Sequence, residues 1–182
     1  MTQPAHPTTG GRTPAGLLQE EAELALPSLN EMDAIAIGER ILTAAITRQL
    51  PITIEVRRAA RVVFRAALPG SSADNDAWIA RKARVVERFG HASLCQRVLH
   101  ETAGSKFEES SGLPTAEYAA HGGGLPLCVA GTGMVGIAIV SGLPQLEDHD
   151  LVAGCIREHL ADLAAIAAGS DSAAPATPAA EQ

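Results

Sequence analysis

The sequence is poor in aromatic residues and lysine, and it has no long apolar run. Only 3% of its 182 residues are aromatic, so it lacks the stacking surface with which proteins bind single-stranded nucleic acid. No segment approaches the ~20 apolar residues of a membrane helix, and the N-terminus lacks a basic segment followed by an apolar one. We therefore expect a cytoplasmic protein whose partners include neither a membrane nor a nucleic acid.

Cysteine is scarce as well. Cys95, Cys128 and Cys155 are odd in number, far apart, and form no C-x-x-C pair. This pattern is typical of small core residues in a reducing compartment, and it favours neither disulfides nor a zinc site.

Positive charge is concentrated in the middle of the chain. The net charge is -7, but between Arg57 and Arg97 nine basic residues face three acidic ones, which makes this positive segment +6 and the remainder -13. Such a segment either faces an anionic ligand or an acidic subunit neighbour, or it is a solvated arginine-rich surface.

The chain is long enough for one domain, which we expect at residues 16–168. Residues 1–15 and 169–182 are rich in Pro, Ala, Thr and Gly or Ser, a composition typical of disordered tails. A capping box at Ser28 and Glu31 predicts a helix up to Leu50, with a weaker helix before it at residues 17–26. Further along, apolar periodicity predicts strands at 52–57 and 61–66, helices at 74–89, 92–103 and 114–120, strands at 125–130 and 134–140, and a helix at 147–168.

This order predicts an α+β fold, in which two hairpins form a central antiparallel sheet flanked by helices. Residues 134–140 should form an inner, fully buried strand because their apolar run leaves no polar face, whereas 52–57 alternates like a half-exposed strand. Gly131, Gly133 and Gly136 also match the dinucleotide pattern G-x-G-x-x-G, but a short β-branched run follows where a phosphate-binding helix should begin. The hairpin is the better interpretation.

The second hairpin should bring its polar, glycine-rich ends together, because a three-residue glycine turn reverses the chain. Small residues beside polar side chains are what a small-ligand pocket needs. The residues that converge in this interpretation are His121, Gly122, Gly123, Gly124, Ser141, Gly142 and His149.

Lys82 is one of only two lysines in the sequence, and it lies on an apolar helical stripe with Trp78, Val85 and Phe89. It either extends to the edge of the helix or is buried against an anion, for which Asp74 or a ligand is the candidate. His121 and His149 are candidates for a ligand or catalytic role, against a structural one; next to His149, Asp148 could be a helix cap and His149 itself exposed to solvent.

Several motifs occur together in this sequence. They are Leu68-Pro69-Gly70, Asp74-Asn75-Asp76-x-Trp78-Ile79-x-Arg81-Lys82, Arg88-Phe89-Gly90, His121-Gly122-Gly123-Gly124-x-Pro126 and Val135-Gly136 through Val140-Ser141-Gly142-Leu143-Pro144-Gln145. Together they resemble the haem-degrading-domain family, the HbpS-like and GlcG-like group that includes the C-terminal domain of PduO. The resemblance spans about residues 26–163 and is greatest for the branch that ends in Ser-Gly-Leu-Pro-Gln-x-x-Asp-His.

The resemblance implies an antiparallel sheet flanked by helices, assembly into homo-oligomers (dimers or larger), and a small anionic ligand such as haem or another tetrapyrrole. An axial haem ligand of the relatives has no one-to-one counterpart here, so His121 and His149 are both iron candidates. Two alternatives stay open: an enzyme acting on a small anionic metabolite through Lys82 and His121, or an oligomeric interaction scaffold without catalysis. The resemblance places the pocket at Asp74, Asn75, Lys82, His121, Gly122, Gly123, Gly124, Ser141, Gly142 and His149.

Overall fold

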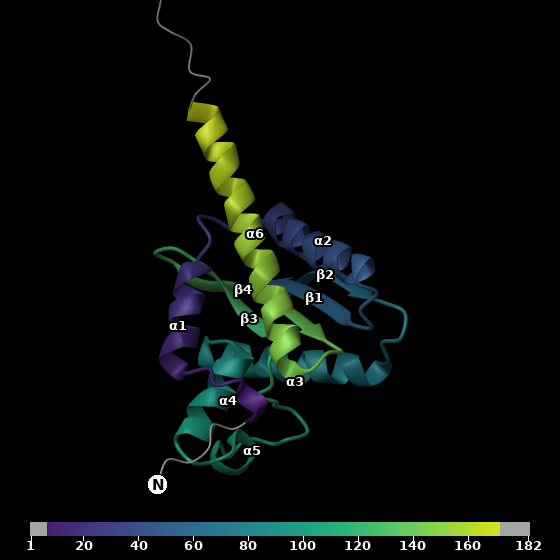
Figure 1. Cartoon of the computed structure of the whole chain (residues 1–182), viewed down its shortest axis with the longest axis vertical. Helices are drawn as coiled ribbons and strands as arrows, with labels where there is room; N and C mark the ends of the chain where they lie inside the picture. The colour runs from purple at the N-terminus through teal and green to yellow at the C-terminus, as the bar shows by residue number, and fades with distance from the viewer. Residues whose placement is uncertain (1–6, 172–182) are drawn as a thin grey trace, which may run out of the picture.

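The computed structural model describes residues 7–171, which form one antiparallel sheet with helices on both of its faces (Figure 1). Residues 1–6 and 172–182, which hold most of the two expected tails, lie outside the described residues. Residues 7–15 contain a short turn and the start of the first helix. The elements are η1 Pro7–Thr9, α1 Pro14–Glu23, α2 Glu31–Thr47, β1 Thr53–Arg58, β2 Arg61–Ala67, α3 Ala73–Phe89, α4 Ser93–Thr102, α5 Phe107–Ser110, β3 Gly124–Val129, β4 Gly133–Ser141 and α6 Gln145–Asp171.

The sheet has the strand order β2-β1-β4-β3, and every neighbouring pair is antiparallel. The predicted α+β class with two hairpins is therefore confirmed. At the tip of the second hairpin, Gly131 and Gly133 have φ angles of 75° and 95°, which the turn requires and which glycine adopts without strain. The G-x-G-x-x-G match lies in this tip and in β4, and no helix opens on it.

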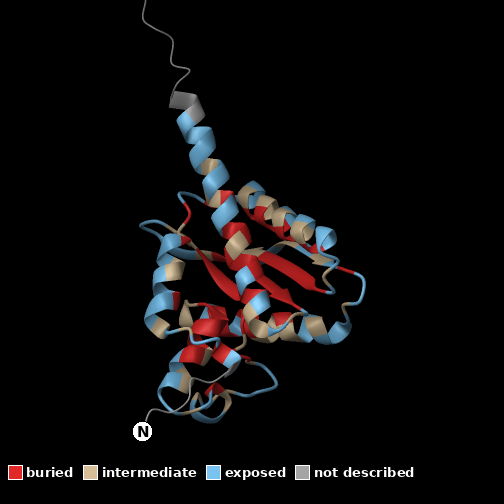
Figure 2. Ribbon diagram, viewed as in Figure 1, coloured by how far each residue is buried: buried red, intermediate tan, exposed pale blue. Residues whose placement is uncertain are grey.

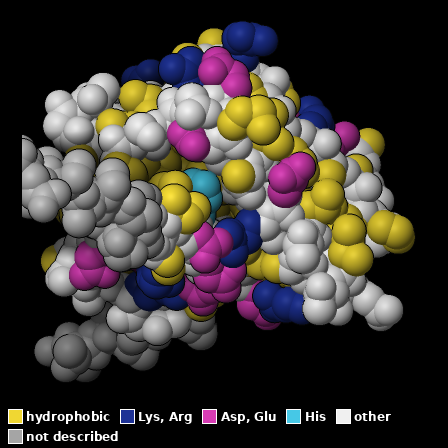
Figure 3. Space-filling view, turned by 90° about the horizontal axis from the view of Figure 1, so that it is seen from above, with side chains coloured by type: hydrophobic (Ala, Val, Ile, Leu, Met, Phe, Trp, Pro, Cys, Tyr) yellow, Lys and Arg dark blue, Asp and Glu magenta, His cyan; other side chains and the backbone are white. Residues whose placement is uncertain are grey.

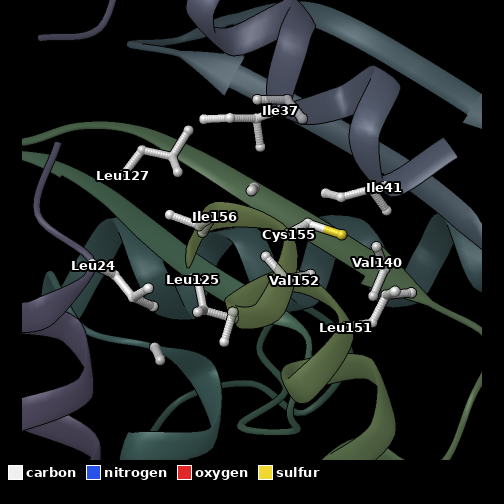
Figure 4. Close-up of a cluster of buried hydrophobic side chains, with 14 of the residues drawn as sticks. Leu24, Ile37, Ile41, Leu125, Leu127, Val140, Leu151, Val152, Cys155 and Ile156 are labelled. Carbon is white, nitrogen blue, oxygen red and sulfur yellow. The ribbon is translucent and has the colours of Figure 1, made fainter. Parts of the chain in front are cut away.

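Strand β4 lies between β1 and β3, as predicted, and contributes side chains to two separate cores. Ala138 and Val140 pack in the main core with α2 and α6 (Figure 4), whereas Ile137 and Ile139 pack against α3 on the opposite face. The prediction of a fully buried strand is wrong for its first residues: β4 is buried only from Gly136 onward, because Gly133 and Met134 lie at the tip of the hairpin, where Met134 is 37% exposed. Figure 2 shows the buried sheet between these two helical layers.

Strand β1 is buried, and the prediction that it is half exposed was wrong. Thr53 to Val56 are all buried, because β1 is an inner strand with α2 on one face and α3 on the other. Glu55 is only 1% exposed, and its carboxylate accepts hydrogen bonds from Arg57 Nε at 2.7 Å and Arg65 Nη1 at 2.9 Å. The carboxylate of Glu55 is therefore buried and held by two arginines, whereas Arg57 and Arg58 at the end of β1 stay partly exposed.

Two helix predictions need correction. The cap of α2 is Asn30, not Ser28: the Asn30 side chain accepts from the amides of Met32 and Asp33, and Asp33 accepts from the amide of Asn30. The short helix expected at residues 114–120 is a turn, and a single helical turn, α5, lies just before it. The three cysteines are free, as expected, and burial raises the pKa of each thiol.

Candidate ligand-binding site

A pocket of about 230 Å³ lies where the end of β4 passes into α6, beside the N-terminal half of α3. The loop before β3 and the β4–α6 connection meet here, as predicted from the hairpin, and the first half of α3 forms the remaining wall. The lining residues are Asp74, Asn75, Trp78, Lys82, His121, Ser141, Gly142, Leu143, Gln145 and Asp148.

Lys82 is buried, with 3% of its surface exposed, although its side chain reaches the pocket wall. Its Nζ donates to Asp148 Oδ2 at 2.9 Å and to the carbonyl oxygen of Val140 at 3.0 Å. The ammonium therefore lies against an anion, and of the two alternatives for Lys82 the buried one is right. Its partner is not Asp74, whose carboxylate instead accepts a hydrogen bond from Trp78 Nε1 at 3.2 Å.

Asp148 is 1% exposed and joins α6 to two other segments. One carboxylate oxygen accepts from Lys82 and the other accepts from the amide of Leu143 at 3.1 Å. Burial raises the pKa of Asp148 and lowers the pKa of Lys82, while the attraction between the two charges opposes both shifts. Each residue stabilises the charged form of the other in a site from which water is largely excluded.

The glycine triplet before β3 allows close packing and does not line the pocket. A Cβ atom on Gly123 would lie 2.8 Å from Lys82 Nζ and 2.6 Å from the carbonyl oxygen of Val140, and one on Gly122 would lie 1.9 Å from the carbonyl oxygen of Gln145. At Gly124, the amide donates to Ser93 Oγ at 3.1 Å. These glycines let the loop approach α3, β4 and α6 closely enough to enclose the ion pair.

His121 forms part of the pocket wall and is partly exposed. Its ring contacts Trp78 edge-on at 4.9 Å between centroids, and Arg97 Nη1 lies 3.4 Å from its Nε2. Burial, and next the positive charge of Arg97, lower the pKa of His121 to about 4, so its imidazole is neutral at pH 7. Its Nδ1 makes no hydrogen bond to any residue in the described range.

His149 does not line the pocket, although it follows Asp148 directly. Its side chain is 1% exposed, so it is not the solvent-facing residue considered above, and its Nε2 lies 2.8 Å from Glu20 Oε2 on α1. The hydrogen bond from His149 is the main reason why the pKa of Glu20 is lowered. The two histidines therefore have different positions: His121 lines the pocket, whereas His149 on α6 contacts Glu20 on α1.

Asn75 and Ser141 do line the pocket, and Asn75 also accepts a hydrogen bond from the amide of Ser72 at 2.7 Å at the start of α3. The sequence argument missed four lining residues as site residues: Trp78, Leu143, Gln145 and Asp148. A signal for Asp148 existed, because it lies four residues before Val152 and seven before Cys155, on the buried face of α6. Extending the apolar periodicity of α6 by one turn toward its N-terminus would have predicted that Asp148 is buried.

Five of the nine basic residues of the positive segment form ion pairs with carboxylates in the described structure. Arg57 pairs with Glu55 and Glu87, Arg65 pairs with Glu55 and Asp76, and Arg97 pairs with Glu101. The molecular face in Figure 3 likewise has basic and acidic side chains next to each other. Close to the pocket, Arg81 lies over the Trp78 ring, 3.9 Å from its centroid.

Two further observations concern the described range, residues 7–171. It contains no cluster of three or more His, Cys, Asp or Glu side chains that could hold a metal ion. None of its helices combines the length and the apolar character needed to cross a membrane.

The fold and the pocket define a small α+β domain that holds a buried lysine–aspartate pair at the wall of a polar cavity. Residues 29–157 match the family model described as "Haem degrading protein HbpS-like", and the chain belongs to this HbpS-like family. A UPF0303 protein of Streptomyces coelicolor is 45% identical over 161 residues, which cover 88% of this chain and 99% of the relative.

Solved structures show the same fold. The crystal structure of the Ybr137w protein has a TM-score of 0.77 and 27% identity, covering 85% of this chain and 91% of the other. A complex described as PduOC with heme has a TM-score of 0.57 at 18% identity, covering 72% and 94% of the two chains. The predicted family is confirmed.

Proposed function

We propose that this chain is a small-ligand-binding protein and that its ligand occupies the pocket beside Lys82. The observation that carries the proposal is a buried ammonium at the wall of a cavity, next to hydrogen-bonding groups from three segments of the chain. A concave site with a few convergent polar groups is typical of small-molecule binding sites. Only two of the three donors of the Lys82 ammonium have protein acceptors in the described residues, which leaves one for a ligand.

The size of the pocket sets the size of the ligand. A volume of about 230 Å³ lies below the roughly 300–1,000 Å³ of pockets that enclose drug-sized molecules. A whole haem does not fit inside it, whereas a metabolite of a few carbon atoms does. The wall and rim carry Lys82 and Arg81 against Asp74 and Asp148, so a small anion would meet a balanced set of charges.

The single tryptophan of the sequence is Trp78, which lines the pocket, so its fluorescence reports on this site. We expect at least one of acetate, glyoxylate, succinate or inorganic phosphate to change Trp78 emission saturably. Lys82→Met should abolish the response, because it removes the ammonium. Lys106→Met is the matched control, since Lys106 is an exposed lysine paired with Glu109. A response that is unchanged in folded Lys82→Met would place the ligand elsewhere.

Haem is a second candidate, favoured by His121 and by the description of the family. His121 lines the pocket with a neutral imidazole, which is the form that ligates iron. Its Nδ1 is buried near Glu108 and its Nε2 lies 3.4 Å from Arg97 Nη1, so the ring would have to turn to reach an iron atom. Because the pocket is too small for the macrocycle, haem would have to remain at its mouth.

Haemin titration tests this candidate. We expect His121→Ala to remove any saturable Soret shift, and His91→Ala to leave it unchanged, because His91 lies on Glu21 away from the pocket. No shift with the wild-type protein rules haem out. If all the small anions also leave Trp78 unaffected, the interaction scaffold is the better account of the chain.

We further propose that the chain forms homo-oligomers. Val62 and Met134 are large apolar residues left 49% and 37% exposed near one end of the sheet, a kind of surface that a second copy could cover. Light scattering that gives the 18.8 kDa mass of a single chain would contradict this proposal.

A further inference from the structure

The surroundings of Lys82 suit a reactive amine as well as a structural cation. Lys82 is buried and lines the pocket, and its Nζ lies 2.9 Å from a carboxylate that is itself buried. A desolvated lysine beside a proton acceptor is the usual arrangement of amines that attack carbonyl groups. A purely structural ion pair could be fully enclosed, whereas Lys82 and Asp148 both line the pocket.

We infer that Lys82 forms an imine with a small carbonyl compound that enters this pocket, and that Asp148 transfers the protons of the reaction. This deepens the proposed function: it rests on the same pocket and assigns to its ligand an aldehyde or ketone group. A substrate with a carboxylate beside the carbonyl, such as a small 2-oxo acid, matches the volume, and Arg81 over the Trp78 ring offers a cation for its carboxylate.

The proton balance follows from the contacts that Nζ makes. The ammonium first passes one proton to Asp148 Oδ2, and the freed lone pair of Nζ attacks the carbonyl carbon while the C=O π electrons move to oxygen. The oxygen takes up that proton and then a second one from Nζ, again through Asp148, and leaves as water when the C=N bond forms. The third proton stays on the iminium nitrogen, where the carbonyl oxygen of Val140, now 3.0 Å from Nζ, can accept its hydrogen bond.

Burial supports the first transfer. It lowers the pKa of Lys82 and raises the pKa of Asp148, which brings the neutral amine and the neutral acid closer in energy to the ion pair. The other titratable or charged groups around the pocket are His121, Asp74 and the neighbouring Arg81 and Arg97. His121 is neutral at pH 7, so it adds no charge beside Lys82.

The composition of the chain makes the test unusually clean, because Lys82 and Lys106 are its only lysines. The full chain is incubated at pH 7 with glyoxylate and cyanoborohydride, which reduces an imine to a stable carboxymethyl-amine, and the modified residue is located by peptide mass mapping. We expect Lys82 to be labelled at least severalfold faster than Lys106, since burial lowers the pKa of the Lys82 amine and so raises its neutral, reactive fraction. Asp148→Asn should slow labelling of Lys82 and leave that of Lys106 unchanged.

The outcomes separate this inference from the proposed function. If Lys106 and the N-terminal amine are labelled and Lys82 is not, the inference is overturned. If glyoxylate still changes Trp78 emission in that case, the binding pocket stands and only the covalent step fails. If Lys82 is not labelled and none of the four small anions changes Trp78 emission, the inference and the proposed binding pocket are both wrong. Because the comparison between Lys82 and Lys106 is made in the wild-type chain, it remains decisive even if the Asp148 variant does not fold.

Discussion

Asp148→Ala is expected to lower the free energy of unfolding by about 3–5 kcal/mol, because it leaves the ammonium of Lys82 buried without a counter-charge. The ammonium lies 2.9 Å from Asp148 and keeps only one other acceptor, the carbonyl oxygen of Val140. Its site is too enclosed for water to replace the carboxylate fully. Urea unfolding at pH 7, followed by circular dichroism, measures the difference.

Three variants serve as controls for this effect. Asp74→Ala should change the free energy of unfolding by no more than about 0.5 kcal/mol, because Asp74 is exposed and does not contact Lys82. Lys82→Met should destabilise the chain less than Asp148→Ala if the stranded carboxyl group can take up a proton. Combining Lys82→Met with Asp148→Leu should recover part of the loss, since no buried charge then remains. If Asp148→Ala unfolds at the same urea concentration as the wild-type chain, the Lys82–Asp148 pair is exposed to water in solution.

The ion pair also shows how far sequence reasoning reaches. The apolar stripe of α3 was enough to identify Lys82 as anomalous, because helical periodicity is local and can be counted. Its partner lies 66 residues away, on another helix, and only the path of β4 brings the two together. Asp74 was the nearest acid in sequence, but it is exposed, and its carboxylate accepts a hydrogen bond from Trp78 Nε1. Local patterns identify buried positions, whereas pairing across elements depends on the tertiary arrangement.

The same reason separates the successes from the failures elsewhere. Both hairpins and the family were predictable from turn residues and contiguous motifs. The burial of β1 was not, because Glu55 and Arg57 look solvent-facing unless one knows that α3 covers them. His149 was misjudged in the same way: α1 supplies Glu20, and no residue near His149 in sequence indicates that contact.

The role assigned to the glycine triplet can be tested with Gly123→Ala, which we expect to cost about 2–5 kcal/mol. Gly123 has a φ of 111°, so an L-residue there pays about 1–2 kcal/mol for its backbone conformation. The added Cβ would also lie 2.6 Å from the carbonyl oxygen of Val140, and such overpacking costs about 1–3 kcal/mol more. Denaturant unfolding of the variant gives the sum.

Gly112→Ala is the matched control, because Gly112 also has a positive φ, 69°, but nothing within 4 Å of a Cβ placed there. It should therefore show the backbone cost alone, and the difference between the two variants measures the close approach to the ion pair. Since the Gly123 Cβ would lie 2.8 Å from Lys82 Nζ, Gly123→Ala and Asp148→Ala should be strongly non-additive when combined. Equal costs for the Gly123 and Gly112 variants, or simple additivity with Asp148→Ala, would mean that the loop does not hold Lys82 in place.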